Sequence, residues 1–529
     1  MGNSDNLLYE RQSVSRAAGT VGFFTFLSRI LGLVRDMVIA RFFGTGMAAD
    51  AFFVAFRIPN LLRRLFAEGS LTIAFIPVFT EYLSQRTKSE AFQMARAVMT
   101  LLLLILGLIT VAGILFSPLI VRIQAFGFGG QGPKYELTVL LTRVTFPYIF
   151  FISLVALYMG ILNSLRHFAA PAAAPILLNV GMILSVLWIS PHLPQPILGA
   201  AIGVVLGGIL QVALQVPWVV KKGISLAPCW MPGHPAVRRV GALMAPAVFG
   251  SAIYQFNQFM GTLLASFLPE GSVSWLYYAD RLVQFPLGVF AIAISTAALP
   301  SLSKQAAEED LGDFCDTLNH ALRLVFFITI PSMMGLILLG DLIVSVLFER
   351  GVFDSFSRVM TNRALFYYTL GLWAFSGIRV MVSAYYALQD TKTPVKVAAV
   401  SLGANLLFSL LLMGPLKHGG LALALSLSST IQFCLLALLL KRKMALLELR
   451  PVMVSACKCL VASAITGLVI FLLREEIAPI GSQTGIISLA LVLAGLVFGG
   501  VLIYFLVSAA MGSGELRSLW GVVRYRGRR

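Results

Sequence analysis

The chain has 529 residues, of which 58% are hydrophobic and only 12% are charged, and its formal net charge is +17. Soluble domains carry about 25% charged residues, so this composition excludes a soluble fold and indicates a protein whose surface faces a lipid bilayer. Basic residues in a membrane protein set topology, bind anionic headgroups or line a pathway, so no nucleic-acid partner is expected.

The apolar segments predict an all-α polytopic membrane protein with 14 transmembrane helices, because a span needs about 20 mostly apolar residues. The first segment is too long for a cleavable signal peptide and contains charged residues, so it is expected to remain as a span. The second, eighth and tenth segments are unusually long, and Pro59 and Pro286 are expected to bend two of them. In chain order the predicted spans are 17–40, 49–82, 98–120, 137–163, 170–190, 195–219, 240–268, 271–301, 317–340, 359–388, 394–414, 419–440, 452–473 and 486–511.

The distribution of Lys and Arg predicts the orientation. With the N-terminus in the cytoplasm, the predicted cytoplasmic segments carry 21 Lys and Arg, and the predicted outer loops carry seven. Positive residues are enriched on the cytoplasmic side of membrane proteins, so both termini are predicted to be cytoplasmic. Five further cations lie near span ends and are expected to extend to the interface: Arg143, Arg323, Arg363, Lys396 and Lys458.

Two proline landmarks indicate an internal duplication. The segment 73–79 recurs loosely as 296–302, and Pro171 recurs as Pro394, both at an offset of 223 residues. Two copies of six spans with like topology are typical of parallel-repeat transporters, although a chance match of prolines is the alternative. The predicted division is an N-terminal lobe over 1–219, a cytoplasmic linker over 220–239, a C-terminal lobe over 240–440, and a region over 441–529 with the last two spans and a basic tail.

Eleven ionisable residues lie inside four predicted spans, where an isolated charge costs about 2.5–3.5 kcal/mol. All seven cations among them are arginines, whose planar forks bind phosphate in a bidentate manner, so an anion such as a diphosphate is the expected ligand. Local pairing is the alternative for Arg64 with Glu68, for Asp280 with Arg281, and for Asp36 with an arginine of another span. The eleven are Arg29, Arg35, Asp36, Asp50, Arg57, Arg63, Arg64, Glu68, Asp280, Arg281 and Arg379.

Three blocks around these charges resemble the signature of the MurJ (MviN) family. They are Ser28-Arg-Ile-Leu-Gly-Leu-Val-Arg-Asp36, the stretch from Phe43-Gly-Thr-Gly through Arg-Ile-Pro59-Asn to Glu68-Gly69, and Ser274-Trp-Leu-Tyr-Tyr-Ala-Asp-Arg-Leu-Val-Gln-Phe-Pro286. The family is part of the multidrug/oligosaccharidyl-lipid/polysaccharide exporter superfamily. The resemblance implies two six-helix lobes around a cationic cavity, and a groove for a polyprenyl tail formed by the last two helices.

The resemblance also implies a function. A lipid flippase, not an enzyme, would carry lipid II, the diphosphate-linked disaccharide-pentapeptide precursor of peptidoglycan, between leaflets of the bacterial inner membrane by alternating access. The protein is expected to act as a monomer in the phospholipid bilayer. The resemblance assigns substrate binding to Arg29, Arg35, Asp36, Arg63 and Arg281. The signature carries Asp50 and Glu68, and we place them with Arg57, Arg64, Asp280 and Arg379 as supporting or gating residues.

Some relatives bind sodium through acids on the seventh and eleventh helices. The corresponding spans here offer only neutral polar residues, namely Gln255, Asn257, Gln258, Asn405 and Ser409. No sodium site, other metal site or cofactor is therefore predicted, and the sequence leaves open whether the membrane potential or an ion gradient drives transport. The five cysteines form no CxxC pair and predict neither a disulfide framework nor a metal site.

Three other functions were weighed. A drug or cation exporter of the same superfamily should have acids in its cavity, and the arginine excess argues against it. A flippase for another polyprenyl-diphosphate glycan stays open, because one chain does not show headgroup preference. A membrane glycosyltransferase would need catalytic acids or a histidine in a sizeable outer loop, and the longest outer loops, 121–136 and 341–358, contain no histidine.

Overall fold

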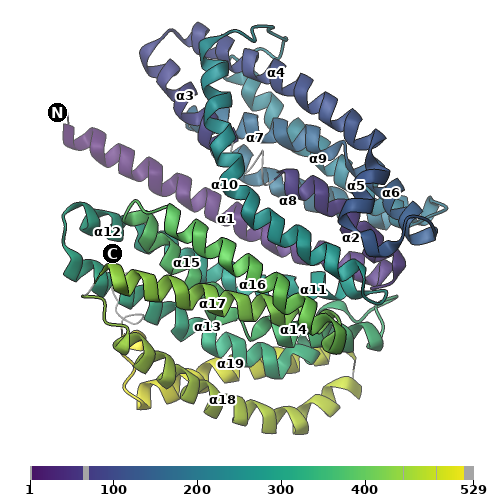
Figure 1. Ribbon diagram of the computed structural model, residues 1–529, viewed down its shortest axis with the longest axis vertical. Helices are drawn as coiled ribbons and strands as arrows, with labels where there is room; N and C mark the ends of the chain where they lie inside the picture. Colours follow the sequence, from purple (N-terminus) through teal and green to yellow (C-terminus); the bar gives the residue numbers. More distant parts are fainter. Residues whose placement is uncertain (1–2, 64–70, 445, 484, 518–529) are drawn as a thin grey trace. The chain divides into compact units, whose positions relative to one another are not determined.

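The computed structural model describes residues 3–63, 71–444, 446–483 and 485–517, and within these ranges all regular secondary structure is helical (Figure 1). A helix satisfies its own backbone hydrogen bonds, and lipid offers no water to do so, which is why these apolar segments become helices. The predicted all-α class is confirmed. By internal contacts the chain forms two compact units, Met1–Ser274 and Trp275–Arg529, described separately below.

Within its described residues, the first unit holds ten α-helices, three short 3-10 or π segments and the start of an eleventh helix. The elements are α1 (Asn3–Phe43), α2 (Met47–Leu62), α3 (Thr72–Gln85), α4 (Lys88–Leu115), α5 (Ser117–Gln124), η2 (Phe126–Phe128), α6 (Pro133–Thr145), α7 (Tyr148–Ser164), α8 (Ala169–Leu184), η3 (Ser185–Ile189), η4 (Ser190–His192), α9 (Ile197–Lys221), α10 (Pro235–Ser266) and the first residues of α11 (Ser272–Pro286).

The second unit contains the rest of α11 and the remaining helices. They are η5 (Leu287–Ala291), α12 (Ile292–Ala307), α13 (Leu311–Phe348), α14 (Ser355–Thr369), α15 (Leu372–Ala387), α16 (Lys392–Leu416), α17 (His418–Lys443), α18 (Arg450–Gln483) and α19 (Ile486–Ala510). Helix α13 is its central element and packs against α12, α14, α15, α18 and α19. The last two helices are held to α13 by a core cluster of Leu339, Leu342, Ile470 and Leu496.

The described helices agree with a multi-pass membrane protein. Ten helical segments are long and apolar enough to cross a bilayer, and α14 with α15 supplies an eleventh as a pair bent by 44°. The other three predicted spans coincide with α1, with α2 and α3, and with α10. Eight of the eleven predicted in-span charges fall in 17–40 and 49–82, so uniform apolarity is not expected there. A count of 14 spans is consistent with these helices.

Several spans are interrupted where the sequence restricts the backbone. Pro286 is followed directly by the π-helical turn η5, so the predicted bend in the eighth span has a structural counterpart. Pro59 lies inside α2, which ends three residues later at Leu62. The predicted single helix over 137–163 is divided into α6 and α7 just before Tyr148, at a proline. Proline therefore marks these interruptions better than the length of the apolar segments does.

Glycine allows a close helix contact in the first unit, between α8 and α9. A side chain added at Gly207 would lie 2.8 Å from the Cα of Leu178, and one added at Gly181 would lie 2.9 Å from the Cα of Gly207. Small residues allow backbones in membranes to approach this closely. Helix α10 also packs within the first unit, against α3, and Arg239 at its start pairs with Glu81 of α3 at 2.9 Å. The predicted lobe boundaries stay a prediction.

Candidate functional site

The first part of the site is built on α1 around Arg35. Its guanidinium donates from Nε and Nη2 to Oδ1 of Asp36, at 3.0 and 2.7 Å, and both side chains are buried. Its Nη1 donates to Oδ1 of Asn179 on α8 at 3.0 Å. Asp36 therefore pairs with its own neighbour, and its expected pairing with an arginine of another span stays a prediction. Two fixed acceptors hold the guanidinium of Arg35 in one orientation.

Asn179 was missed by the sequence reasoning. Its amide donates from Nδ2 to the backbone carbonyl of Ser28 at 3.0 Å while its oxygen accepts from Arg35, so it links two places on α1. A buried amide in an apolar span needs partners, because leaving it unpaired in lipid is costly. The isolated Asn in the predicted span 170–190 was a signal that could have been used.

The remaining predicted residues of the first unit lie in different surroundings. Arg29 is exposed on α1. Arg63 is partly buried, and its Nε donates to Asn60 Oδ1 at 3.1 Å. Arg57 is partly buried and joins α2 to α10, donating to the carbonyl of Gln258 at 2.9 Å and to Thr262 Oγ1. Arg64 and Glu68 lie outside the described residues, so their predicted pairing is not described.

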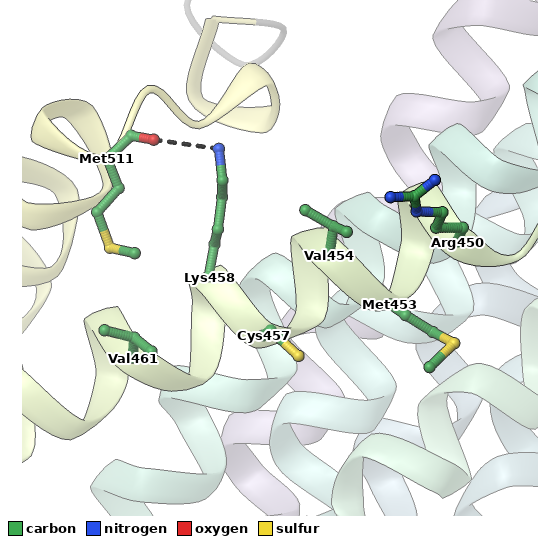
Figure 2. A pocket seen from close by; sticks show the side chains of 7 residues that line it. All are labelled: Arg450, Met453, Val454, Cys457, Lys458, Val461 and Met511. Atoms are coloured by element: carbon green, nitrogen blue, oxygen red, sulfur yellow. Dashed lines mark hydrogen bonds between the residues drawn. The ribbon is translucent and has the colours of Figure 1, made fainter.

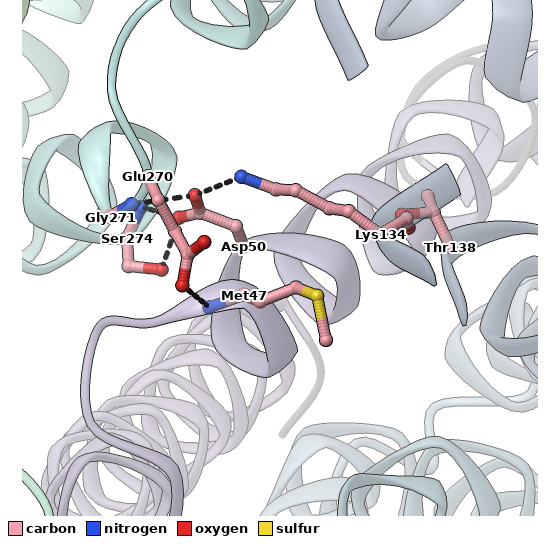
Figure 3. Close-up of polar contacts among 7 residues, drawn as sticks. All are labelled: Met47, Asp50, Lys134, Thr138, Glu270, Gly271 and Ser274. Atoms are coloured by element: carbon pink, nitrogen blue, oxygen red, sulfur yellow. Dashed lines mark hydrogen bonds and ion pairs between the residues drawn. The ribbon is translucent and has the colours of Figure 1, made fainter. Parts of the chain in front are cut away.

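Asp50, in the first turn of α2, has three partner residues (Figure 3). Its side chain is 1% exposed and pairs with Nζ of Lys134 from α6 at 2.8 Å. It also accepts from the backbone N–H groups of Gly271 and Ser274, at 2.8 and 2.9 Å, and from Ser274 Oγ at 2.6 Å. Asp50 thereby satisfies amides at the start of α11, where a helix has no partners of its own.

A second acid, Glu270, caps the N-terminus of α2. Glu270 Oε1 accepts from the N–H of Met47, the first residue of α2, at 2.7 Å (Figure 3). Two carboxylates carry about −2, Lys134 about +1 and each helix N-terminus about +0.5, so the junction is roughly neutral. We call Met47, Asp50, Lys134 and 270–274 the Asp50 junction. Glu270 was missed because an acid in a short loop is ordinary.

The second unit holds the other predicted residues. Arg281 Nη2 donates to the hydroxyl of Tyr277 at 2.9 Å, and the guanidinium carbon lies 4.9 Å from the centroid of the same ring. Asp280 Oδ1 accepts from Gln284 Nε2 at 3.4 Å, and both Asp280 and Arg281 are partly buried. Arg379 is exposed on α15. A tyrosine one turn away therefore orients Arg281, and an aromatic face tolerates a guanidinium well.

Among the described residues, no three His, Cys, Asp or Glu side chains gather in a way that could hold a metal ion. Gln255, Asn405 and Ser409 are buried within their own units. The expected absence of a sodium site stays a prediction. All five cysteines are free.

Comparison with known proteins gives one consistent family. The family model described as lipid II flippase MurJ matches residues 39–507. A probable lipid II flippase MurJ of Vibrio cholerae serotype O1 is 42% identical over 424 residues, which cover 79% of this chain and 81% of the relative. The lipid II flippase MurJ of Burkholderia cenocepacia is 39% identical over 432 residues, covering 81% of this chain and 84% of the relative.

Solved structures agree. A structure described as lipid II flippase MurJ, inward closed conformation, is 28% identical, has a TM-score of 0.78, and covers 93% of this chain and 98% of its own. An inward-facing multidrug resistance MATE family transporter of the MOP superfamily has a TM-score of 0.67 at 14% identity, covers 79% of this chain and 95% of its own, and shows the shared fold alone. The family match spans most of the chain and includes every predicted site residue except Arg29, Arg35 and Asp36, which precede it. The chain belongs to the MurJ family of lipid II flippases.

Proposed function

We propose that this chain carries lipid II from the cytoplasmic to the periplasmic leaflet of the bacterial inner membrane. It is a transporter and not an enzyme, in keeping with its family. The observation that carries the proposal is a guanidinium, that of Arg35, buried in α1. A charge costs several kcal/mol in lipid, and guanidinium forks match the oxygens of a diphosphate. The arginines are therefore suited to the headgroup of a polyprenyl-diphosphate lipid.

In this proposal Arg29, Arg35, Arg63 and Arg281 bind the headgroup, and Asp36 competes with it. Arg35 donates two hydrogen bonds to Asp36, so a diphosphate that approaches Arg35 must displace or share these bonds. Asn179 keeps Nη1 of Arg35 in place during that exchange. Competition from Asp36 thereby lowers the affinity of Arg35 for the headgroup. A carrier needs a moderate affinity, because it must release its substrate on the other side of the membrane.

The Asp50 junction is proposed as part of the outer gate. The predicted orientation puts the N-termini of α2 and α11 on the periplasmic side. Two of the four hydrogen bonds to Asp50 come from backbone N–H groups, which water can satisfy when the junction separates. A near-neutral junction of this kind holds two helix ends together without an unpaired buried charge, and it is suited to opening and closing during alternating access.

The remaining parts of the proposal concern the tail and the energy source. Helix α19 is strongly apolar and only 11% of its most apolar window is buried, which suits contact with a polyprenyl chain.

We propose that the protein works as a monomer with both termini in the cytoplasm. The membrane potential or an ion gradient drives it without a resident sodium ion. Lipid II is favoured over other polyprenyl-diphosphate glycans because the curated relatives carry that name.

This function would be tested with the purified protein in proteoliposomes that carry labelled lipid II in the inner leaflet. The measured quantity is the rate at which the label reaches the outer leaflet. Arg281→Ala should lose about 3 kcal/mol of charged hydrogen bonding, or roughly 100-fold in transport, and Arg281→Lys should recover only part. Arg239→Ala is the control, because Arg239 forms an exposed ion pair with Glu81. Normal transport by Arg281→Ala would contradict the assigned role. Equal transport of a polyprenyl-diphosphate glycan without the pentapeptide would contradict lipid II specificity.

A further inference from the structure

A groove of about 430 Å³ lies along the first turns of α18 in the second unit (Figure 2). Most of its residues recur at helical spacing on one face, so the groove follows the helix for about 16 Å, at 1.5 Å per residue. The side chains between its two cations are apolar or thiol. The lining residues are Arg450, Met453, Val454, Cys457, Lys458, Val461 and Met511.

Two cations accompany this apolar face. Arg450 is the first residue of α18, and its exposed guanidinium has no acidic partner within the described part of the chain. A positive charge at a helix N-terminus is unfavourable, because that end of the helix already carries a partial positive charge. Lys458 donates to the Met511 carbonyl at 3.2 Å, and an ammonium has two more N–H groups to offer. An anion from outside the chain would neutralise the charge of Arg450 and accept a further hydrogen bond from Lys458.

The groove lies on a helix whose composition suits a lipid bilayer. The segment Arg450–Arg474 is long and apolar enough to span a bilayer, and Met453 and Val454 are 66% and 51% exposed. The loop before α18 follows three further cations, Lys441, Arg442 and Lys443, at the end of α17. Such clusters at the end of a span attract anionic headgroups at about 1 kcal/mol per cation. The occupant must therefore combine an acyl chain with a negatively charged headgroup.

We propose that this groove is a binding site for an anionic phospholipid of the bilayer. The phosphate accepts hydrogen bonds from Arg450 and Lys458, and an acyl chain lies along Met453, Val454 and Val461. The bound lipid neutralises the start of α18 and fills the space beside Met511, so it acts as a structural lipid for the C-terminal helix pair. The site is distinct from the headgroup-binding arginines and does not depend on the proposed function.

Native mass spectrometry of the full-length protein in detergent would test the site by titration with phosphatidylglycerol and phosphatidylcholine of identical chains. The wild-type protein should bind its first phosphatidylglycerol at least about tenfold more tightly than phosphatidylcholine, because two cations favour the net negative headgroup. The double variant Arg450→Gln/Lys458→Gln should lose this preference. The matched control Lys441→Gln/Arg442→Gln removes the same charge outside the groove lining and should reduce the preference by less than the groove variant does.

A steric variant separates the groove from its charges. Val454→Trp fills the groove and should weaken the first phosphatidylglycerol several-fold, whereas Leu460→Trp, on the same helix outside the lining, should not. Circular dichroism and gel filtration would show that each variant is folded. Equal binding of the two lipids by the wild-type protein would overturn the proposal. So would an unchanged preference in Arg450→Gln/Lys458→Gln, or displacement of the bound lipid by equimolar lipid II.

Discussion

Two buried carboxylates, Asp50 in the first unit and Glu515 in the second, organise helix ends in different ways. Asp50 is 1% exposed and Glu515 is 4% exposed. Each accepts hydrogen bonds from three separate residues, so each tolerates burial because its charge is compensated. The kind of donor distinguishes them. Two of the four hydrogen bonds to Asp50 come from backbone N–H groups at a helix start and two from side chains, whereas Glu515 accepts from the side chains of Arg323, Ser455 and Ser513.

Glu515 follows α19 and fastens the C-terminal segment to two helices. Its Oε1 accepts from Arg323 Nε of α13 at 2.5 Å and from Ser455 Oγ of α18 at 2.8 Å, and its Oε2 accepts from Ser513 at 2.7 Å. A later point of α18 is also held, because Arg474 donates to the Leu338 carbonyl at 2.6 Å. With the core cluster between them, these contacts hold α18 on α13 from Ser455 to Arg474.

The difference suggests two uses of a buried acid. Backbone amides at a helix start can exchange a carboxylate for water, so the Asp50 junction is suited to reversible separation. Glu515 instead joins Arg323 of α13 to Ser455 of α18, so its loss would release two packed helices from each other, and its contacts suit permanent attachment. The two acids should therefore differ in whether their loss affects transport or stability.

The largest effect is expected for Asp50→Asn. The substitution keeps the shape but removes the charge that Lys134 and two helix N-termini share, so the closed junction should be weakened. Transport in proteoliposomes should fall roughly 100-fold, the equivalent of about 3 kcal/mol, while the free energy of unfolding falls by less. Lys134→Gln should cause a smaller loss, since the amides remain paired. If transport by Asp50→Asn stays within twofold of wild type, the junction is not a gate.

The next effect is on stability and is expected for Glu515→Ala. Removing the acid leaves Arg323 and Ser455 without their shared acceptor, which should lower the free energy of unfolding by about 2–3 kcal/mol, allowing for the partial exposure of Arg323. Chemical unfolding in detergent would measure it. A double-mutant cycle with Arg323→Ala should show strong coupling. Transport per folded molecule should stay near wild type, and a selective loss of transport would erase the contrast with Asp50.

Lowering the pH also tests the contribution of Glu515 to stability, because it protonates the carboxylate without a substitution. Burial acts to raise the pKa of Glu515, but hydrogen bonds from Ser513, Ser455 and Arg323 outweigh it and lower the pKa to about 2, from an ordinary value of 4.5. A carboxyl with a depressed folded pKa contributes its full stability above the ordinary value and loses it as the pH falls toward 2. The loss should reach about 3 kcal/mol at most. Glu515→Gln should flatten the stability profile over this range, and an unchanged slope would contradict the assignment.

The helices and the charged residues could be predicted from the sequence, whereas most partners of those residues could not. Apolar runs such as 486–511 become helices because lipid leaves no other way to satisfy the backbone. Asp50 stood out as an acid within a predicted span. Its partners Gly271 and Ser274 are more than 200 residues away and offer backbone N–H groups, which have no sequence signature.

Glu270 and Glu515 were missed for a related reason. Both lie outside the predicted spans, where an acid is ordinary and only the fold makes it unusual. Arg323 was expected to extend to the interface, as long cations near span ends do. It also pairs with Glu515, which follows α19. The expected extension of Arg323 to the interface stays a prediction, and its acidic partner could be found only from the path of the C-terminal segment.

The smallest effect is expected for Asp354→Ala, which provides an exposed reference for the two buried acids. Asp354 precedes α14 and accepts from the N–H of Ser357 at 2.8 Å, and this bond lowers the pKa of its carboxyl. Its loss should lower the free energy of unfolding by about 1 kcal/mol, as for other helix caps, because water reaches the freed amide. Faster hydrogen exchange at Ser357 would report the change, Asp354→Asn should largely preserve the cap, and transport should be unaffected. A stability loss as large as that of Glu515→Ala would show that burial is not what separates these acids.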